Sequence, residues 1–228
     1  MSFTLDHVVP WGRSFDEYVR MFYLTEEDLN RRILGCADGP SSFNSEMKPH
    51  GHRVISCDPL YRFSAKEIES RISETYDTVI EQTSRNKSNF VWDTIQSVEE
   101  LGKVRMDAMR KFLDDYEQGK KDGRYLAEEL PVLPFAAKQF DLALCSHFLF
   151  LYTGQLSLDF HRSSIHEMCR VAREVRIFPL IDLGVTKSPY VELIIPELEQ
   201  CGFKVSIEQV PYEFQRGGNE MMKILDSW

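Results

Sequence analysis

Residues 33–39 read ILGCADG, which places two glycines, an alanine and an aspartate directly after a short apolar run. Small side chains at Gly35, Ala37 and Gly39 let the backbone approach a ligand closely, and the N–H groups at the start of a following helix would face that ligand. The turn alone does not decide the fold, because it lacks a complete G-x-G-x-x-G pattern. Its meaning depends on the segments around it.

Five short apolar segments recur along the chain and alternate with longer amphipathic stretches. They are RRILG (31–35), HRVISCD (52–58), RYLAEEL (124–130), FDLALCS (140–146) and EVRIFPLID (174–182). Near-continuous apolar runs are typical of parallel strands that helices cover on both faces. After the helical segment 188–203, residues 204–214 and 220–225 flank QRGGN and predict an antiparallel hairpin. The pattern predicts an α/β fold with a doubly wound, mostly parallel sheet.

Residues 62–123 are too long for an ordinary crossover and predict a helical insertion after the second strand. We expect one domain over residues 1–228. The insertion is expected to form a lid over the site or, alternatively, only to enlarge the hydrophobic core. The basic residues of GKVRMDAMRK (102–111) are expected on a solvated helix face. Ser/Thr-x-x-acid pairs mark the expected helix starts inside and before the insertion: Ser14–Glu17, Thr25–Asp28, Ser64–Glu67 and Ser97–Glu100.

The composition restricts the classes of partner. Lys and Arg number 27 against 36 Asp and Glu, a net charge of −9, which disfavours nucleic acid as a partner. The five cysteines form no C-x-x-C pair, so we expect reduced thiols, no metal site and a cytoplasmic location. No apolar run reaches the roughly 20 residues that span a bilayer, and the N-terminus lacks a secretion-signal pattern, so no membrane association is expected. The oligomeric state is left open.

Asp58 follows Gly39 by 19 residues and stands at the end of the second predicted strand. An acidic residue about 20 positions beyond a glycine-rich turn is placed to accept hydrogen bonds from ribose hydroxyls. The turn and Asp58 together therefore predict a nucleotide-containing cofactor.

The sequence here resembles the class I S-adenosylmethionine-dependent methyltransferases over roughly residues 25–225. GCADG (35–39) resembles their first motif, and ISCDP (55–59) resembles the acidic end of their second strand. LPVLPFAAKQFDLALCSHFLFLY (130–152) is similar to the small-molecule branch of the family. Two positions depart from the pattern, because Ile33 stands where an acidic residue often lies and Ala37 replaces the middle glycine.

The resemblance implies a Rossmann-like, seven-stranded sheet and S-adenosylmethionine as cofactor. Asp58 then takes the role of the ribose clamp, and Glu129, preferred over Glu128, that of the adenine-contacting acid. Asp38 is a partial replacement for the acid missing at Ile33. The full set of cofactor-binding residues that it implies is Gly35, Cys36, Ala37, Asp38, Gly39, Asp58, Pro59, Glu129 and Ser146.

In this fold the segment after the fourth strand, SHFLFLY (146–152), lies beside the reactive methyl group. His147 is its only side chain that titrates near neutral pH and is the candidate general base. Tyr152 is the candidate for positioning the acceptor. For both residues the alternative is a packing role, because they lie among aromatic neighbours. Asp182 ends the fifth predicted strand and either faces the ligand or caps the next turn.

The expected function is S-adenosylmethionine-dependent methyl transfer to a small-molecule acceptor. A noncatalytic protein that uses the fold and binds a protein partner through the helical insertion is the alternative. A nicotinamide-dependent dehydrogenase shares the turn and the ribose acid, but the L-P-F segment at 133–135 and the closing hairpin disfavour it.

Overall fold

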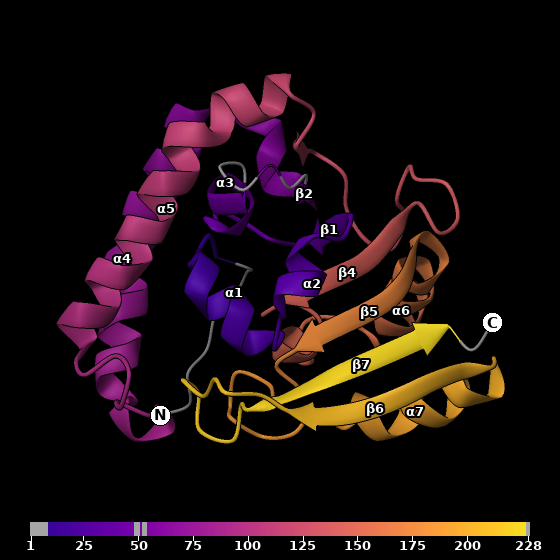
Figure 1. The fold of residues 1–228 in the computed structure, drawn as a ribbon. Helices are drawn as coiled ribbons and strands as arrows, with labels where there is room; N and C mark the ends of the chain where they lie inside the picture. Colours follow the sequence, from indigo (N-terminus) through magenta and orange to yellow (C-terminus); the bar gives the residue numbers. More distant parts are fainter. Residues whose placement is uncertain (1–8, 48–50, 52–53, 227–228) are drawn as a thin grey trace.

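The computed structural model describes residues 9–47, 51 and 54–226. Its seven strands form one sheet in the order β3-β2-β1-β4-β5-β7-β6 (Figure 1). Strands β1 to β5 run parallel, and β7 pairs antiparallel with both β5 and β6. This confirms the predicted doubly wound sheet with its antiparallel C-terminal pair.

The strands are short at the β3 edge of the sheet and longer at the β6 edge. Their bounds are β1 Ile33–Cys36, β2 Val54–Cys57, β3 Tyr125–Leu126, β4 Phe140–Ser146, β5 Ala172–Phe178, β6 Phe203–Gln209 and β7 Glu220–Asp226. The fifth strand begins earlier than predicted and ends before Pro179, which has no N–H to donate to a ladder. The third is confined to two residues that pair with β2 alone.

Helices connect the strands, and two of them lie within residues 62–123. Their bounds are α1 Phe15–Met21, α2 Glu26–Leu29, α3 Phe43–Met47, α4 Ala65–Arg85, α5 Val98–Lys121, α6 Leu158–Val171 and α7 Tyr190–Gln200. The predicted N-caps Ser14, Thr25, Ser64 and Ser97 each accept a hydrogen bond from the backbone three residues on. Local capping chemistry therefore predicted these helix starts correctly.

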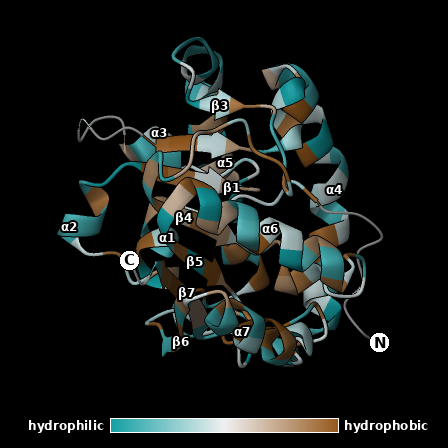
Figure 2. Ribbon diagram, turned by 90° about the vertical axis from the view of Figure 1, so that its right-hand side faces the viewer, coloured by the Kyte–Doolittle hydropathy of each residue, from teal (hydrophilic) through white to brown (hydrophobic). Residues whose placement is uncertain are grey.

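Apolar side chains cover both faces of the sheet. Helices α6 and α7 pack on one face, against residues such as Ala143 and Val175. Helices α1 and α3 pack on the other, against Ile33, Val54 and Leu142. In Figure 2 the central strands are mainly brown, whereas α4 alternates between teal and brown, as expected of a helix that buries one side.

Helices α4 and α5 form a slab beside the β3 end of the sheet and α1 (Figure 1). Ile68 and Ile72 of α4 pack with Met109 and Phe112 of α5. Arg105 of α5 is fully buried, and its Nη1 donates to Oε2 of Glu17 in α1 at 2.5 Å. The expectation that the basic residues of this segment are all solvated is therefore wrong for Arg105, because it lies on the packed side of α5.

Candidate functional site

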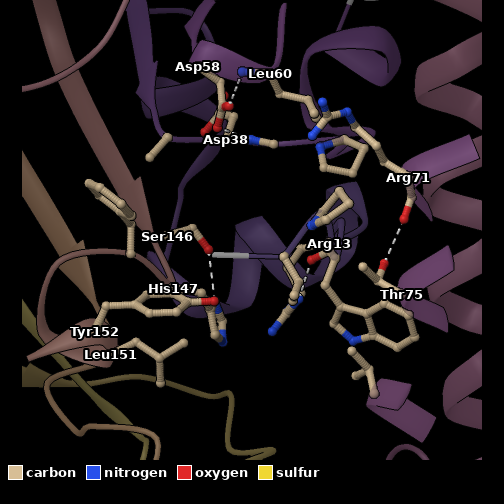
Figure 3. Close-up of a pocket in the computed structure, with 18 of the residues that line it drawn as sticks. Arg13, Asp38, Asp58, Leu60, Arg71, Thr75, Ser146, His147, Leu151 and Tyr152 are labelled. Carbon is tan, nitrogen blue, oxygen red and sulfur yellow. Dashed lines mark hydrogen bonds between the residues drawn. The ribbon is translucent and has the colours of Figure 1, made fainter. Parts of the chain in front are cut away.

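A cavity of about 810 Å³ opens at the carboxyl ends of β1, β2 and β4. The strand register explains the position, because Cys36 pairs with both Cys57 and Cys145 and so sets the ends of these strands level. Ligands in open α/β sheets bind at this edge, where the connections from neighbouring strands diverge. Helix α4 forms the opposite wall (Figure 3). The volume is at the upper end of the range for small-molecule sites, roughly 300–1,000 Å³.

The turn after β1 presents backbone to the cavity. Ala37 and Gly39 line the cavity with positive φ values of 56° and 54°. A side chain at Gly39 would have no atom within 4 Å, so that side of the turn is open. The Ala37 N–H donates to the Cys57 carbonyl at 2.8 Å, which ties the turn to β2. The result is a rigid cradle with room for a ligand beside Gly39.

Asp38 turns inward instead of toward the cavity opening. Its carboxylate accepts hydrogen bonds from the Tyr18 hydroxyl at 2.9 Å and the Ser56 hydroxyl at 2.6 Å. Burial raises the pKa of this group to about 6, against the opposing effect of the two hydroxyls. The carboxylate occupies the space that a Cβ at Gly35 would need, so this glycine is required by Asp38.

Two predicted cofactor residues do not line the cavity. Gly35 and Cys36 lie within β1, and the Cys36 thiol packs between the sheet and helices α6 and α7. The expected helix N-terminus is also used internally, because the Arg13 carbonyl accepts from Ser42 N–H at 3.0 Å and Ser41 Oγ accepts from Phe43 N–H at 3.2 Å. Ligand contact at this turn is therefore limited to residues 37–40.

Asp58 directly follows β2 and faces the turn. Its Oδ2 accepts from Gly39 N–H at 2.8 Å and its Oδ1 from Leu60 N–H at 2.7 Å. Burial raises the pKa of Asp58 to about 6, and the charge of Glu129 adds to the effect of burial while the two backbone donors oppose it. A carboxylate has about four acceptor positions, so Asp58 keeps capacity for a ligand's hydroxyl groups.

Pro59 and Glu129 extend the same side of the cavity. Both residues line it, and Glu129 forms an exposed ion pair with Arg62 at 3.7 Å. Glu128 does not line the cavity, which agrees with the choice of Glu129 from the sequence.

Ser146 and His147 end β4 and line the cavity opposite α4 (Figure 3). His147 adopts a positive φ of 51°, and its Nδ1 lies 2.9 Å from Ser146 Oγ. Burial, with the nearby charges of Arg13 and Arg105, moves the pKa of His147 well below its usual value. The imidazole is therefore neutral at physiological pH, and the same burial and charges make it a weak base. Backbone conformations of this kind occur often at functional sites.

Tyr152 was predicted either to position the acceptor or to pack in the core. In the structure it lines the cavity and is also part of the apolar core. Around it the cavity becomes apolar, with walls formed by Val79, Phe90, Leu151, Leu183 and Phe214. Asp182 takes the capping role instead, since its Oδ1 accepts from Gly184 N–H at 2.8 Å and Thr186 N–H at 3.0 Å. It does not line the cavity.

Sequence reasoning missed two groups of cavity residues. Trp11 and Arg13 precede α1 and line the cavity beside His147 and Tyr152. From α4 the cavity receives a polar stripe at helical spacing, Arg71, Thr75, Thr78 and Gln82. That spacing is visible in the sequence, but polar residues facing a cavity and polar residues facing solvent give the same pattern.

Within the described residues, no cluster of three or more His, Cys, Asp or Glu side chains is arranged to hold a metal ion. The helices in the described ranges are not long and apolar enough for any of them to cross a lipid bilayer.

A protein described as uncharacterized protein MJ0045, from Methanocaldococcus jannaschii, is 36% identical to this chain over 222 residues, covering 96% of the chain and 97% of the relative. No protein-family model matches the chain. The match spans α4 and α5 as well as the strands of the sheet.

Solved structures of several methyltransferases have a similar architecture. The mitomycin 7-O-methyltransferase MmcR superimposes with a TM-score of 0.50 and 12% identity, covering 93% of this chain and 53% of that longer chain. Magnesium protoporphyrin IX methyltransferase from Synechocystis PCC 6803, solved with bound S-adenosylmethionine, gives a TM-score of 0.47 and 12% identity over 93% of this chain and 78% of that one. Together with the strand order, the likeness to MmcR gives this chain the class I methyltransferase fold.

Proposed function

This chain belongs to the same family as MJ0045 of Methanocaldococcus jannaschii and has the class I methyltransferase fold, and from this premise we propose its function. We propose that it is an S-adenosylmethionine-dependent methyltransferase acting on a small-molecule acceptor. The observation that carries the proposal is the pairing of the Asp58 carboxylate with the open turn at Gly39 in a single cavity. This cavity continues past Ser146 to an apolar end that is suited to a second ligand.

The residues present fit the cofactor. The open backbone at Gly39 leaves a cradle beside the turn, and Asp58 has acceptor capacity for ribose hydroxyls next to it. Pro59 and Glu129 follow on the side expected to contact adenine. When bound, S-adenosylmethionine supplies an electrophilic methyl group on a sulfonium centre.

The acceptor side of the reaction requires mainly alignment, because methyl transfer is a displacement at carbon. The apolar end near Tyr152 excludes water and orients the acceptor. His147 lies between this end and the turn, and its neutral imidazole orients the acceptor by accepting a hydrogen bond, because the lowered pKa makes it a weak base. Ser146 Oγ holds the imidazole through Nδ1. Because all five cysteines are free thiols, we expect the reaction to take place in the cytoplasm.

Calorimetric titration with S-adenosylhomocysteine and S-adenosylmethionine tests the cofactor assignment. We expect micromolar binding by the wild type and no measurable binding by Asp58→Ala. A matched control is Asp182→Ala, which removes an acid at the same sheet edge that does not line the cavity. A second matched pair is Glu129→Gln, expected to weaken binding, and Glu128→Gln, expected to leave it unchanged. Absence of binding by the wild type contradicts the proposal.

Activity is then measured with methyl-labelled S-adenosylmethionine and fractionated small-molecule extracts, in the wild type and in His147→Ala. Transfer of label to a low-molecular-weight product supports the proposed reaction. Label found only in protein or nucleic acid contradicts the acceptor class.

A further inference from the structure

Two arginines meet behind one end of the cavity. Arg13 lines the cavity just before α1, and Arg105 reaches the same region from α5, where it is fully buried. Their guanidinium groups influence each other, because Arg105 lowers the pKa of Arg13 in addition to the larger effect of burial, to about 10. Both charges also act on His147. The arginines therefore create a positive potential at the cavity end that contains His147.

The protein does not neutralise this potential fully. Glu17 is the carboxylate paired with Arg105, and its oxygens also accept from the Tyr212 hydroxyl at 2.8 Å and the Ser14 N–H at 2.9 Å. Arg13 instead donates from Nη1 to the Trp11 carbonyl at 2.5 Å. Among the residues that the structure describes, two guanidinium groups thus share one carboxylate in a low-dielectric region, which leaves an excess of one positive charge there.

Three donors in this region are left without partners. The Nε atoms of Arg13 and Arg105 and the Nη2 of Arg105 are buried and have no hydrogen-bond partner among the described residues. A buried charged donor without a partner is costly, so native structures place an acceptor beside it or reserve the position for a ligand. Only Arg13 lines the cavity, so its unpartnered Nε and the excess charge together favour an anionic ligand beside Arg13.

The surroundings restrict what carries that anion. Arg13 and His147 lie in the half of the cavity away from Asp38 and Asp58 (Figure 3). Apolar and aromatic side chains line this half, among them Trp11, Leu151 and Phe214, and the Arg105 guanidinium lies 5.9 Å from the Phe214 ring centre. A ligand that fits here has an apolar body with a negatively charged group.

We propose that the acceptor is a small apolar or aromatic carboxylic acid whose carboxylate binds to Arg13, with Arg105 supplying positive potential behind it. A carboxylate matches the planar donor fork of a guanidinium in geometry and charge. The inference rests on the proposed function, since it assigns the end of the cavity beyond His147 to the acceptor. The other source of a carboxylate is the methionine end of the cofactor itself, and the experiment below separates the two.

The test measures benzoate binding to the wild-type protein saturated with S-adenosylhomocysteine, by intrinsic tryptophan fluorescence and calorimetry. We expect benzoate to bind at least about tenfold more tightly than the neutral benzamide, as for a charge-assisted hydrogen bond. Arg13→Gln should abolish this preference, and Arg13→Lys should retain part of it. Arg85→Gln removes an exposed arginine of α4 that does not line the cavity, and should leave the preference unchanged.

The second arm compares S-adenosylhomocysteine with methylthioadenosine, which lacks the amino-acid carboxylate. We expect Arg13→Gln to change the affinities for both nucleosides by the same factor. If it weakens S-adenosylhomocysteine alone, Arg13 binds the cofactor and the inference is overturned. Equal binding of benzoate and benzamide by the wild type overturns it as well. Failure of the wild type to bind S-adenosylhomocysteine is a different result, because it removes the proposed function itself.

Discussion

Replacing Arg105 with methionine should strongly destabilise the protein. Arg105 is 0% exposed and Glu17 is 2% exposed, so the substitution removes the cation that is hydrogen-bonded to a buried carboxylate and leaves only the weaker influence of Arg13. Breaking a buried ion pair in this way typically costs about 3–5 kcal/mol. Domains have unfolding free energies of roughly 5–15 kcal/mol, so the loss is a large fraction of the total.

The lowered pKa of Glu17 has the same sign as this expected loss of stability. Burial opposes ionisation, but Arg105 and Arg13 outweigh it and lower the pKa from 4.5 to about 2. A difference of about 2.5 units corresponds to about 3 kcal/mol. Because the folded pKa lies below the unfolded one, this stabilisation is fully present above pH 4.5 and is lost as the pH falls toward 2.

Urea unfolding followed by circular dichroism at pH 7 measures the effect. We expect Arg105→Met and Glu17→Gln each to lower the unfolding free energy by several kcal/mol, and the double variant to lose less than the sum. Arg110→Met is the matched control, since Arg110 lies on the same helix in an exposed pair with Asp107, and it should change stability by less than about 1 kcal/mol. If Arg105→Met behaves like Arg110→Met, or the double variant is additive, the buried pair does not hold α5 to α1.

Three further predictions concern the site and the thiols. Affinity for S-adenosylhomocysteine should be constant above pH 7 and fall below pH 6. The folded pKa of Asp58 is about 6, and protonation removes a hydrogen-bond acceptor for the ribose. Calorimetric affinities that do not change with pH would contradict this. Ala37→Gly should raise the unfolding free energy by about 0.5–1 kcal/mol by relieving the positive φ, and a lowered thermal midpoint would refute it. Disulfide-exchange titration at pH 8 should modify one thiol, Cys201, in the native protein and five in denaturant, because the other four cysteines are buried.

The sequence allowed correct prediction of features that depend on local chemistry. Capping pairs such as Ser64 with Glu67 mark helix starts because the Ser64 side chain accepts a hydrogen bond from the backbone N–H of Glu67, and the Glu67 side chain accepts one from the backbone N–H of Ser64. These bonds are local and do not depend on where the helix packs. The apolar runs predicted the strands for a similar reason, since helices on both faces require them. The position of Asp58 at the end of β2 was predicted because its spacing from the glycine turn reflects one strand-to-strand crossover, and its role toward a cofactor stays a prediction.

Features that depend on tertiary packing were harder to predict. Arg105 was assigned to solvent from its charge, although Leu101 and Ala108 place it on the apolar stripe of α5, and that stripe was the available signal. Arg13 carried no such signal, because it precedes α1 and the cavity wall it joins is made by distant segments. The inward orientation of Asp38 depends on Tyr18 and Ser56, which no spacing rule connects to it.

Helix α4 uses its two sides for separate purposes. Ile68 and Ile72 join the apolar cluster with α5, while Arg71, Thr75, Thr78 and Gln82 face the cavity. Substitutions on the cavity side therefore leave the packing with α5 intact, and substitutions on the packed side leave the cavity lining intact. The cavity positions of α4 are therefore suited to directed evolution. A library of variants at these positions would change the acceptor side of the cavity while the packed side of α4 stays the same.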